Sequence, residues 1–345
     1  MLHRSRVRAL AFVAVSVALV SVSSVAYAAD VPSFDFTTPV FGLATAPDGS
    51  LLVADAGSGI VELRKGVGKL VAELPEVTDV APEGRGAMWA LTSGEDHKLY
   101  MVTRGGTHQI ADIGAFEAAV NPDGGVIESN PFDLAKLHGK VLIADAAANA
   151  LLIADGVGHV DWVATLPDEL VPTANAKTLV GCPDPIPDFA FACDLPDQIP
   201  AEAVTTSVAV GPDGAYYLSE LKGFPAPIGE SKVWRIEPGT RHAHCGSSPA
   251  CSVVADGFTS IVDINFGPDG TLHVVELDEA SWLAVELGGA DAVGGTIDAC
   301  TWGSFTCTEE ATGLPIPIAV TIGKSGAEYA AIWALVPGQA KVIAL

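Results

Sequence analysis

The chain repeats one two-stranded unit six times. The clearest copy is SVAVGPDGAYYLSEL, from Ser207 to Leu221, in which an alternating run leads into Gly211-Pro212-Asp213-Gly214 and a second alternating run follows. Proline fixes φ at one position of such a turn and glycine supplies a positive φ at another, so the pattern predicts a β-hairpin. Related hairpins are Leu43 to Asp55, Val80 to Thr92, Leu134 to Asp145, Ile264 to Glu276 and Val320 to Ile332. Six such units predict an all-β fold, a six-bladed β-propeller.

Each blade is expected to contain four strands, with the irregular spacing of the repeats taken up by loops. Beyond the hairpins, third strands are predicted near Leu99 to Thr103, Ala150 to Ala154, Lys232 to Glu237 and Trp282 to Leu287. The sixth hairpin is followed only by Ala340 to Leu345, which is enough for one more strand. We therefore predict that Ser33 to Phe36 closes the last blade as an N-terminal strand, because this pairing would remove two open sheet edges.

The N-terminus has the pattern of a secretory signal peptide. Arg4, Arg6 and Arg8 precede an apolar run that ends in Ala26-Tyr27-Ala28, which predicts cleavage after Ala28 and one propeller domain over residues 29–345. A membrane anchor is the alternative, although the run is short and interrupted by serine. Cleavage removes three arginines and no acid, so 15 basic and 42 acidic residues remain, a net charge of −27. Such a surface disfavours nucleic acid and anionic lipid as partners.

Six cysteines fit an oxidising, extracellular or cell-envelope compartment. Six thiols allow about 15 connectivities, and proximity in the sequence favours three local pairs. These pairs are Cys182 with Cys193, Cys245 with Cys251 and Cys300 with Cys307. A zinc site around His242, His244 and Cys245 is the alternative, but the chain lacks a paired short cysteine spacing that would complete it.

Long loops indicate where a ligand would bind. Gly114 to Asn130 and Pro167 to Thr206 both connect one blade to the next, and such connections lie on one face of a propeller. We expect these two loops to roof a channel mouth that forms the ligand site.

Acidic residues recur at two aligned positions of the hairpins. One position is near the start of the first strand and the other is at the end of the second strand, so both lie at the same end of the hairpin. Oxygen ligands gathered there would suit Ca²⁺ and would raise one another's pKa values. The alternative is structural, because an acid at a strand end often caps a turn or accepts a bond from a neighbouring backbone amide. The candidate calcium ligands are Asp79, Asp133, Asp263, Glu220 and Glu276, and the candidate ligand-binding residues are Asn130, Asp133, Asp145, Asn149, Ser207, Glu220, Asp263, Asn265 and Glu276.

Several longer phrases carry a family resemblance. They are GAFEAAVNPDGG (Gly114 to Gly125), SNPFDLA (Ser129 to Ala135), VLIADAAANALL (Val141 to Leu152), TSVAVGPDGAYYLSELKGFP (Thr206 to Pro225) and GFTSIVDINFGPDGTLHVVE (Gly257 to Glu276). These resemble the ScyD/ScyE family, exported propeller proteins named from the scytonemin gene cluster, and the hairpins resemble NHL repeats. The resemblance implies an exported six-bladed propeller and supplies no catalytic residues. The last blade departs from it, with Gly323-Lys324-Ser325-Gly326 and Ile332 in place of Pro-Asp-Gly and a polar residue.

The sequence supports two main functional hypotheses. The first is a secreted binding or scaffold protein for a small molecule, peptide or cell-surface polymer, because the chain has no Gly-x-Ser-x-Gly, His-Glu-x-x-His or Walker motif. The second is a calcium-dependent hydrolase of lactones or esters that resembles gluconolactonases. A quinone-dependent sugar dehydrogenase is disfavoured, because neither His nor Arg stands at the predicted channel mouth.

Overall fold

The computed structural model describes residues 34–65, 67–84, 86–289 and 292–345. The expected signal peptide, residues 1–28, lies outside these ranges. Within them, no helix combines the length and the apolar character that crossing a bilayer requires.

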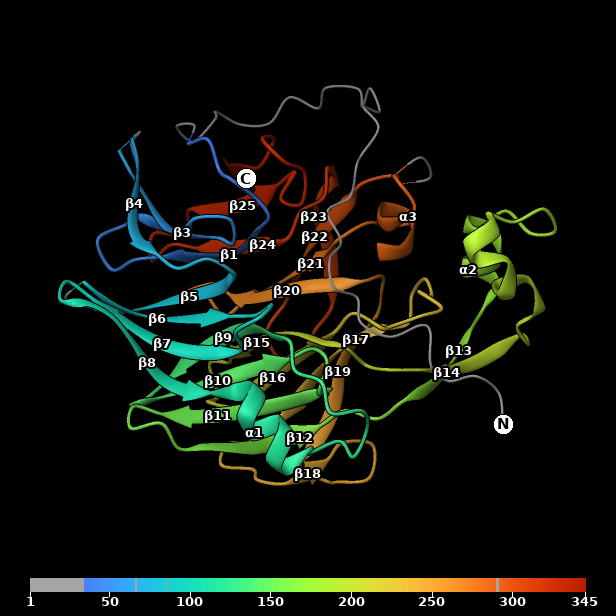
Figure 1. Cartoon of the computed structure of the whole chain (residues 1–345), viewed down its shortest axis with the longest axis horizontal. Helices are drawn as coiled ribbons and strands as arrows, with labels where there is room; N and C mark the ends of the chain where they lie inside the picture. Colours follow the sequence, from blue (N-terminus) through green and yellow to red (C-terminus); the bar gives the residue numbers. More distant parts are fainter. Residues whose placement is uncertain (1–33, 66, 85, 290–291) are drawn as a thin grey trace.

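Six antiparallel sheets stand around a common axis and confirm the six-bladed propeller (Figure 1). Blade 1 contains β1 (Val40–Thr45), β2 (Leu51–Asp55), β3 (Gly59–Arg64) and β4 (Val67–Glu73). Blade 2 contains β5 (Val77–Gly84), β6 (Ala87–Thr92), β7 (Lys98–Thr103) and β8 (Gly106–Asp112). Blade 3 contains β9 (Pro131–Leu137), β10 (Lys140–Asp145), β11 (Ala150–Asp155) and β12 (Val160–Thr165).

The second half of the chain forms the other three blades. Blade 4 contains β15 (Thr205–Val210), β16 (Tyr216–Glu220), β17 (Ser231–Ile236) and β19 (Cys251–Phe258). Blade 5 contains β20 (Ile261–Phe266), β21 (Leu272–Glu276), β22 (Gly295–Cys300) and β23 (Cys307–Leu314). Blade 6 contains β24 (Ala319–Ile322), β25 (Glu328–Ile332) and β26 (Lys341–Ala344). The loop between β17 and β19 adds β18 (Ala243–His244), which pairs in parallel with β12 of blade 3.

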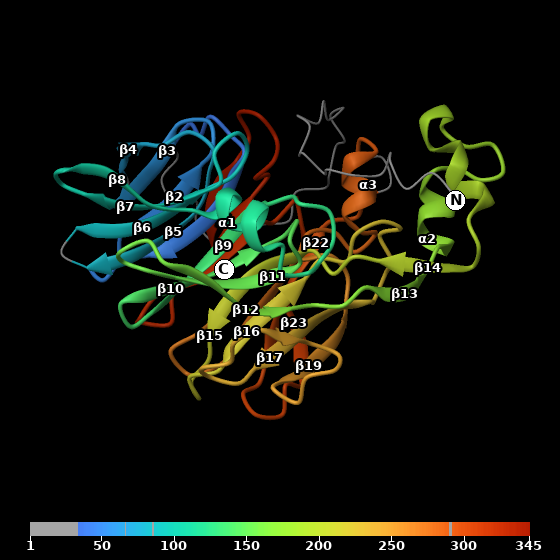
Figure 2. The same ribbon diagram turned by 60° about the horizontal axis from the view of Figure 1, so that its bottom comes forward.

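Helices and an arm cover the face on which the blades are joined. Helix α1 (Ile113–Val120) follows blade 2, and α3 (Trp282–Glu286) lies between β21 and β22. The arm between blades 3 and 4 consists of β13 (Glu169–Pro172), α2 (Ala174–Leu179), the 3-10 helix η1 (Pro187–Asp194) and β14 (Gln198–Ala201). Figures 1 and 2 both show this arm projecting beside the propeller on the side of α3. We call the face on which one blade is joined to the next the loop face. The opposite face, where the first two strands of each blade are joined, is the turn face.

Local chemistry explains the hairpins. Gly49, Gly214 and Gly270 have φ values of +82°, +77° and +90°, as the predicted turns require. The strands that follow them are buried throughout, because each inner region of a blade packs between two neighbouring sheets.

Two sequence predictions about strands are wrong. Residues Trp282 to Leu287 form α3 and its C-terminal cap, whereas the third strand of blade 5 is β22. Blade 6 has three strands, and the described part of Ser33 to Phe36, residues 34–36, forms none; Ser33 lies outside the described residues. The ring of Phe34 instead packs on Gly68 in the outer strand of blade 1, and Phe36 is buried in the hydrophobic core.

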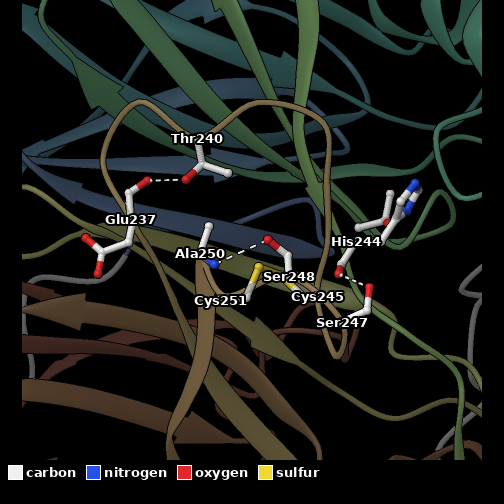
Figure 3. Close-up of a disulfide and its surroundings, with 9 residues drawn as sticks. Glu237, Thr240, His244, Cys245, Ser247, Ser248, Ala250 and Cys251 are labelled. Atoms are coloured by element: carbon white, nitrogen blue, oxygen red, sulfur yellow. Dashed lines mark hydrogen bonds between the residues drawn. A yellow bond between two sulfur atoms is a disulfide. The ribbon is translucent and has the colours of Figure 1, made fainter.

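The three predicted disulfides are confirmed, with Cys182 bonded to Cys193, Cys245 to Cys251 and Cys300 to Cys307. Figure 3 shows the Cys245–Cys251 disulfide, which joins the residue after β18 to the first residue of β19. The alternative zinc site is therefore excluded at Cys245, because a disulfide sulfur cannot act as a thiolate ligand.

Candidate functional site

The inner strands of all six blades surround a central cavity of about 340 Å³. Its wall includes Asp79, Asp133, Asp263 and Asn265, which the sequence analysis selected. Phe41 and Phe132 line its end toward the loop face, and their rings make an edge contact with 5.6 Å between centroids.

The cavity opens on the turn face. Exposure increases in that direction along the inner strands: Gly42 and Leu43 are buried, Ala44 and Thr45 are half-buried, and Lys136 is exposed. No residue of the loops Gly114 to Asn130 or Pro167 to Thr206 lines the cavity. This cavity is therefore not the pocket predicted beneath the two loops, since its lining comes from the inner strands.

The inner acids hold adjacent blades together. Oδ2 of Asp79 accepts a hydrogen bond from the backbone N–H of Leu134 in the next blade at 3.1 Å. Oδ2 of Asp263 accepts one from the backbone N–H of Val320 at 2.7 Å. The structural alternative stated for these acids is thus realised, since each carboxyl satisfies a buried amide on the following inner strand.

Asp133 and Ser207 continue the same pattern and link the acids into a chain. Oδ2 of Asp133 accepts from the backbone N–H of Val208 at 2.7 Å and from Oγ of Ser207 at 2.6 Å. Ser207 Oγ also accepts the backbone N–H of Ile264 at 3.0 Å and lies 2.9 Å from Oδ1 of Asp263. The result is a continuous line of polar groups, Asp79–Asp133–Ser207–Asp263, across four blades.

The number of available donors determines where the protons lie in this line of hydrogen-bonded groups. A serine hydroxyl has one hydrogen to donate, so it cannot donate to Asp133 and Asp263 at once. Burial, together with the charge of Asp133, raises the pKa of Asp263 to about 8, so Asp263 is protonated at neutral pH and donates to Ser207. Burial and the adjacent Asp133 likewise raise the pKa of Asp79 well above its ordinary value. Burial also raises the pKa of Asp133, but hydrogen bonds from Asp79, Ser207 and Val208 oppose this and favour the ionised form at Asp133 over that at its two neighbours.

The acidic position at the end of the second strand has a structural role in three blades. Asp55 accepts the backbone N–H of Thr37 at 2.8 Å, Asp145 accepts that of Asn130 at 2.7 Å, and Glu276 accepts that of Thr259. In each case the acid at the end of the second strand fixes the segment that enters its own blade. These carboxylates lie outside the cavity wall.

Asn149 and Glu220 also lie away from the cavity. Asn149 accepts the backbone N–H of Val204 at 2.8 Å and donates to Asp123 at 3.2 Å. Glu220 is buried, with Lys222 Nζ 3.1 Å from its Oε1. Asn265 does line the cavity, and its amide donates to the backbone oxygen of Val320 at 3.2 Å.

Of the five predicted calcium ligands, only Asp79, Asp133 and Asp263 are brought together. Glu220 and Glu276 lie outside the cavity wall, and Asp79, Asp133 and Asp263 each accept a hydrogen bond from a backbone N–H of the following blade. Calcium takes 6–8 oxygen ligands, so this donor set does not fit the ion.

Comparison with known proteins supports the fold. No protein family and no curated protein matches the sequence. The fold is similar to the PQQ-bound aldose sugar dehydrogenase of Streptomyces coelicolor, with a TM-score of 0.57 and 11% identity over 93% of this chain and 97% of that one. It is also similar to a gluconolactonase of Xanthomonas campestris, with a TM-score of 0.57 and 10% identity over 90% of this chain and 88% of that one.

A third similar structure is the calcium-binding protein regucalcin of Agrobacterium tumefaciens, with a TM-score of 0.54 and 11% identity over 89% of this chain and 85% of that one. At these identities the likeness establishes a shared propeller scaffold, and the chemistry of the site has to come from the residues themselves.

Proposed function

We propose that this chain is an exported binding protein that holds a small organic cation in its central channel. The observation that carries the proposal is the line Asp79–Asp133–Ser207–Asp263 on the wall of a cavity of about 340 Å³. A cavity of this size accommodates a small molecule. One negative charge, centred on Asp133, would attract an ammonium group, and Asn265 and Thr321 add polar atoms to the wall.

Export rests on the N-terminal signal pattern and on the three disulfides, which form and persist in oxidising compartments. The resemblance to the ScyD/ScyE family points in the same direction. N-terminal sequencing of protein recovered outside the cytoplasm tests this part of the proposal, and the expected first residue is Ala29.

Two nearly isosteric variants test the binding site. Asp133→Asn removes the charge, whereas Asp263→Asn replaces a carboxyl that is already neutral. With a panel of amines such as putrescine, arginine and glucosamine, we expect at least one to raise the melting temperature of the wild type and of Asp263→Asn but not of Asp133→Asn. Circular dichroism below the melting temperature shows whether each variant is folded. The proposal fails if no amine binds, or if folded Asp133→Asn binds as tightly as the wild type.

A further inference from the structure

Blades 5 and 6 bring three metal-ligating side chains together outside the lining of the central cavity. They are His273 on β21, Glu310 on β23 and Glu328 on β25. Nδ1 of His273 lies 3.0 Å from Oε2 of Glu310 and 4.0 Å from Oε2 of Glu328. Among the described residues, this is the one group of three or more His, Cys, Asp or Glu side chains whose ligand atoms lie within 4.8 Å of one another.

The cluster is closed on one side and open on the other. The imidazole side chain is only 4% exposed, whereas Glu310 and Glu328 are 32% and 22% exposed. A buried imidazole therefore forms the floor, and the two carboxylates leave a path to solvent. This is the arrangement of a site in which three protein ligands hold an ion and a fourth position remains open.

The carboxylates lack a basic partner. In the described part of the chain, neither Glu310 nor Glu328 lies within 4.0 Å of a lysine or arginine nitrogen. Ligand oxygens of Glu310 and Glu328 lie within 4.8 Å of each other, so the like charges of the two carboxylates repel. Asp269, in the turn between β20 and β21, adds a further negative charge near both Glu328 and His273. A cation would relieve this repulsion.

The ligand types distinguish among cations. One imidazole nitrogen and two carboxylate oxygens suit Zn²⁺ and neighbouring transition ions, whereas Ca²⁺ and Mg²⁺ take oxygen ligands. Zinc bonds of about 2.0–2.2 Å in a tetrahedron place two ligand atoms roughly 3.3 Å apart. The observed separations of 3.0 and 4.0 Å bracket this value, so both carboxylates lie near the spacing from Nδ1 that a bound ion requires.

We propose that His273, Glu310 and Glu328 bind one divalent transition-metal ion, with Zn²⁺ as the favoured ion, and that this ion staples blade 5 to blade 6. The position of this site in the fold indicates how a bound ion would affect the structure. Blade 6 has three strands, and Glu328 begins β25, the middle one. An ion held by both blades would fix that incomplete blade against its neighbour without any additional strand.

The test uses the untagged, full-length chain after treatment with a chelator, because a histidine tag would itself bind the ion. Titration with Zn²⁺ in a calorimeter should give one site per chain and raise the melting temperature. Co²⁺ should give the intense visible absorption of a tetrahedral site. His273→Ala and Glu328→Gln should each weaken Zn²⁺ binding at least about 100-fold.

The matched control is His242→Ala. His242 also faces a carboxylate, with Nε2 2.7 Å from Oδ1 of Asp161, but it is exposed, and no second acid joins the pair among the described residues. This variant should bind Zn²⁺ like the wild type. Glu328→Gln keeps the shape of the side chain, so it tests the site even if the His273 variant misfolds. The proposal is overturned if the wild type binds no transition ion, or if folded Glu328→Gln binds Zn²⁺ with unchanged affinity.

Discussion

Asp79 occupies the space that a side chain at Gly42 would need. A Cβ atom on Gly42 would overlap Oδ1 of Asp79 and lie 2.8 Å from its Cα atom. Gly42 stands at the position of blade 1 that corresponds to Asp79 in blade 2. Blade 1 therefore has no side chain at this position, and the side chain of Asp79 from blade 2 occupies the space.

This relationship predicts that Gly42→Ala is destabilising. The contact involves the backbone of Asp79 and cannot be relieved by rotating one side chain, so we expect a loss of about 2–4 kcal/mol in the free energy of unfolding. Chemical denaturation measures the change. Gly105→Ala is the control, because the nearest atom to a Cβ there is Oγ1 of Thr103 at 3.5 Å. Equal stability of the two variants would contradict the packing described here.

Asp133 and Asp263 should respond differently to the same substitution. Asp263→Asn preserves an acceptor for Val320 and replaces a protonated carboxyl by an amide that can donate to Ser207, so we expect a change below about 1 kcal/mol at neutral pH. Asp133→Asn replaces a charged acceptor by a neutral one and should cost about 2–4 kcal/mol. Denaturation at pH 7 compares the two, and the reverse order would place the charge on Asp263.

The stability of the protein should decrease as pH rises from about 4 to about 8. Burial raises the pKa of Asp263 and of Glu276 to about 8 each and that of Glu220 to about 7. In the unfolded chain these groups lose their protons near pH 4, so between about pH 4 and 8 the folded state binds more protons than the unfolded state. Each such group lowers the unfolding free energy by at most about 1.4 kcal/mol per pH unit in this interval.

Thermal melts at pH 5 and pH 8 test this directly, with the higher melting temperature expected at pH 5. In Asp263→Asn one of the titrating groups is absent, so its stability should change less with pH than that of the wild type. A pH dependence identical to that of the wild type would show that Asp263 does not hold its proton in the folded protein.

The fold was predictable because its signals are local. A turn such as Gly211 to Gly214 and the alternation around it lie within fifteen residues, and each disulfide joins cysteines 6 to 11 positions apart. The short apolar run at Trp282 did not distinguish a strand from a buried helix, since periodicity alone cannot separate the two over so few residues. The N-terminal segment was assigned to an open sheet edge, but Phe34 finds an apolar contact on blade 1 instead.

The site was only partly predictable for a different reason. Alignment of the hairpins identified the two acidic positions, but the partners of Asp79 and Asp133 are amides 55 and 75 residues away. Whether a carboxyl is free or bonded to such an amide depends on how neighbouring blades pack. His273 and Glu310 are 37 residues apart on strands that are not adjacent in their sheet, so no sequence spacing indicated that they meet.

Reduction of Cys182–Cys193 should loosen the arm while leaving the propeller intact. This disulfide joins residues of the arm only, which packs beside the blades rather than within them (Figures 1 and 2). Closing a loop of this length contributes about 2–3 kcal/mol in the chain-entropy description. Replacing both cysteines by serine should therefore expose residues 174–197 to limited proteolysis with little change in the melting of the core. Cooperative loss of the whole fold would contradict this.

Lys222 should be essential for packing the arm against blade 4. Its side chain is fully buried, and its ammonium contacts Glu169 on β13 and lies 3.1 Å from Oε1 of Glu220 on β16. Lys222→Met would leave Glu220 buried without a basic partner, so we expect a loss of about 3–5 kcal/mol. Glu220→Gln in the same chain should restore part of that stability, because it removes the uncompensated acid. A double-mutant cycle from denaturation curves measures the coupling, and strict additivity of the two changes would show that the buried pair does not interact.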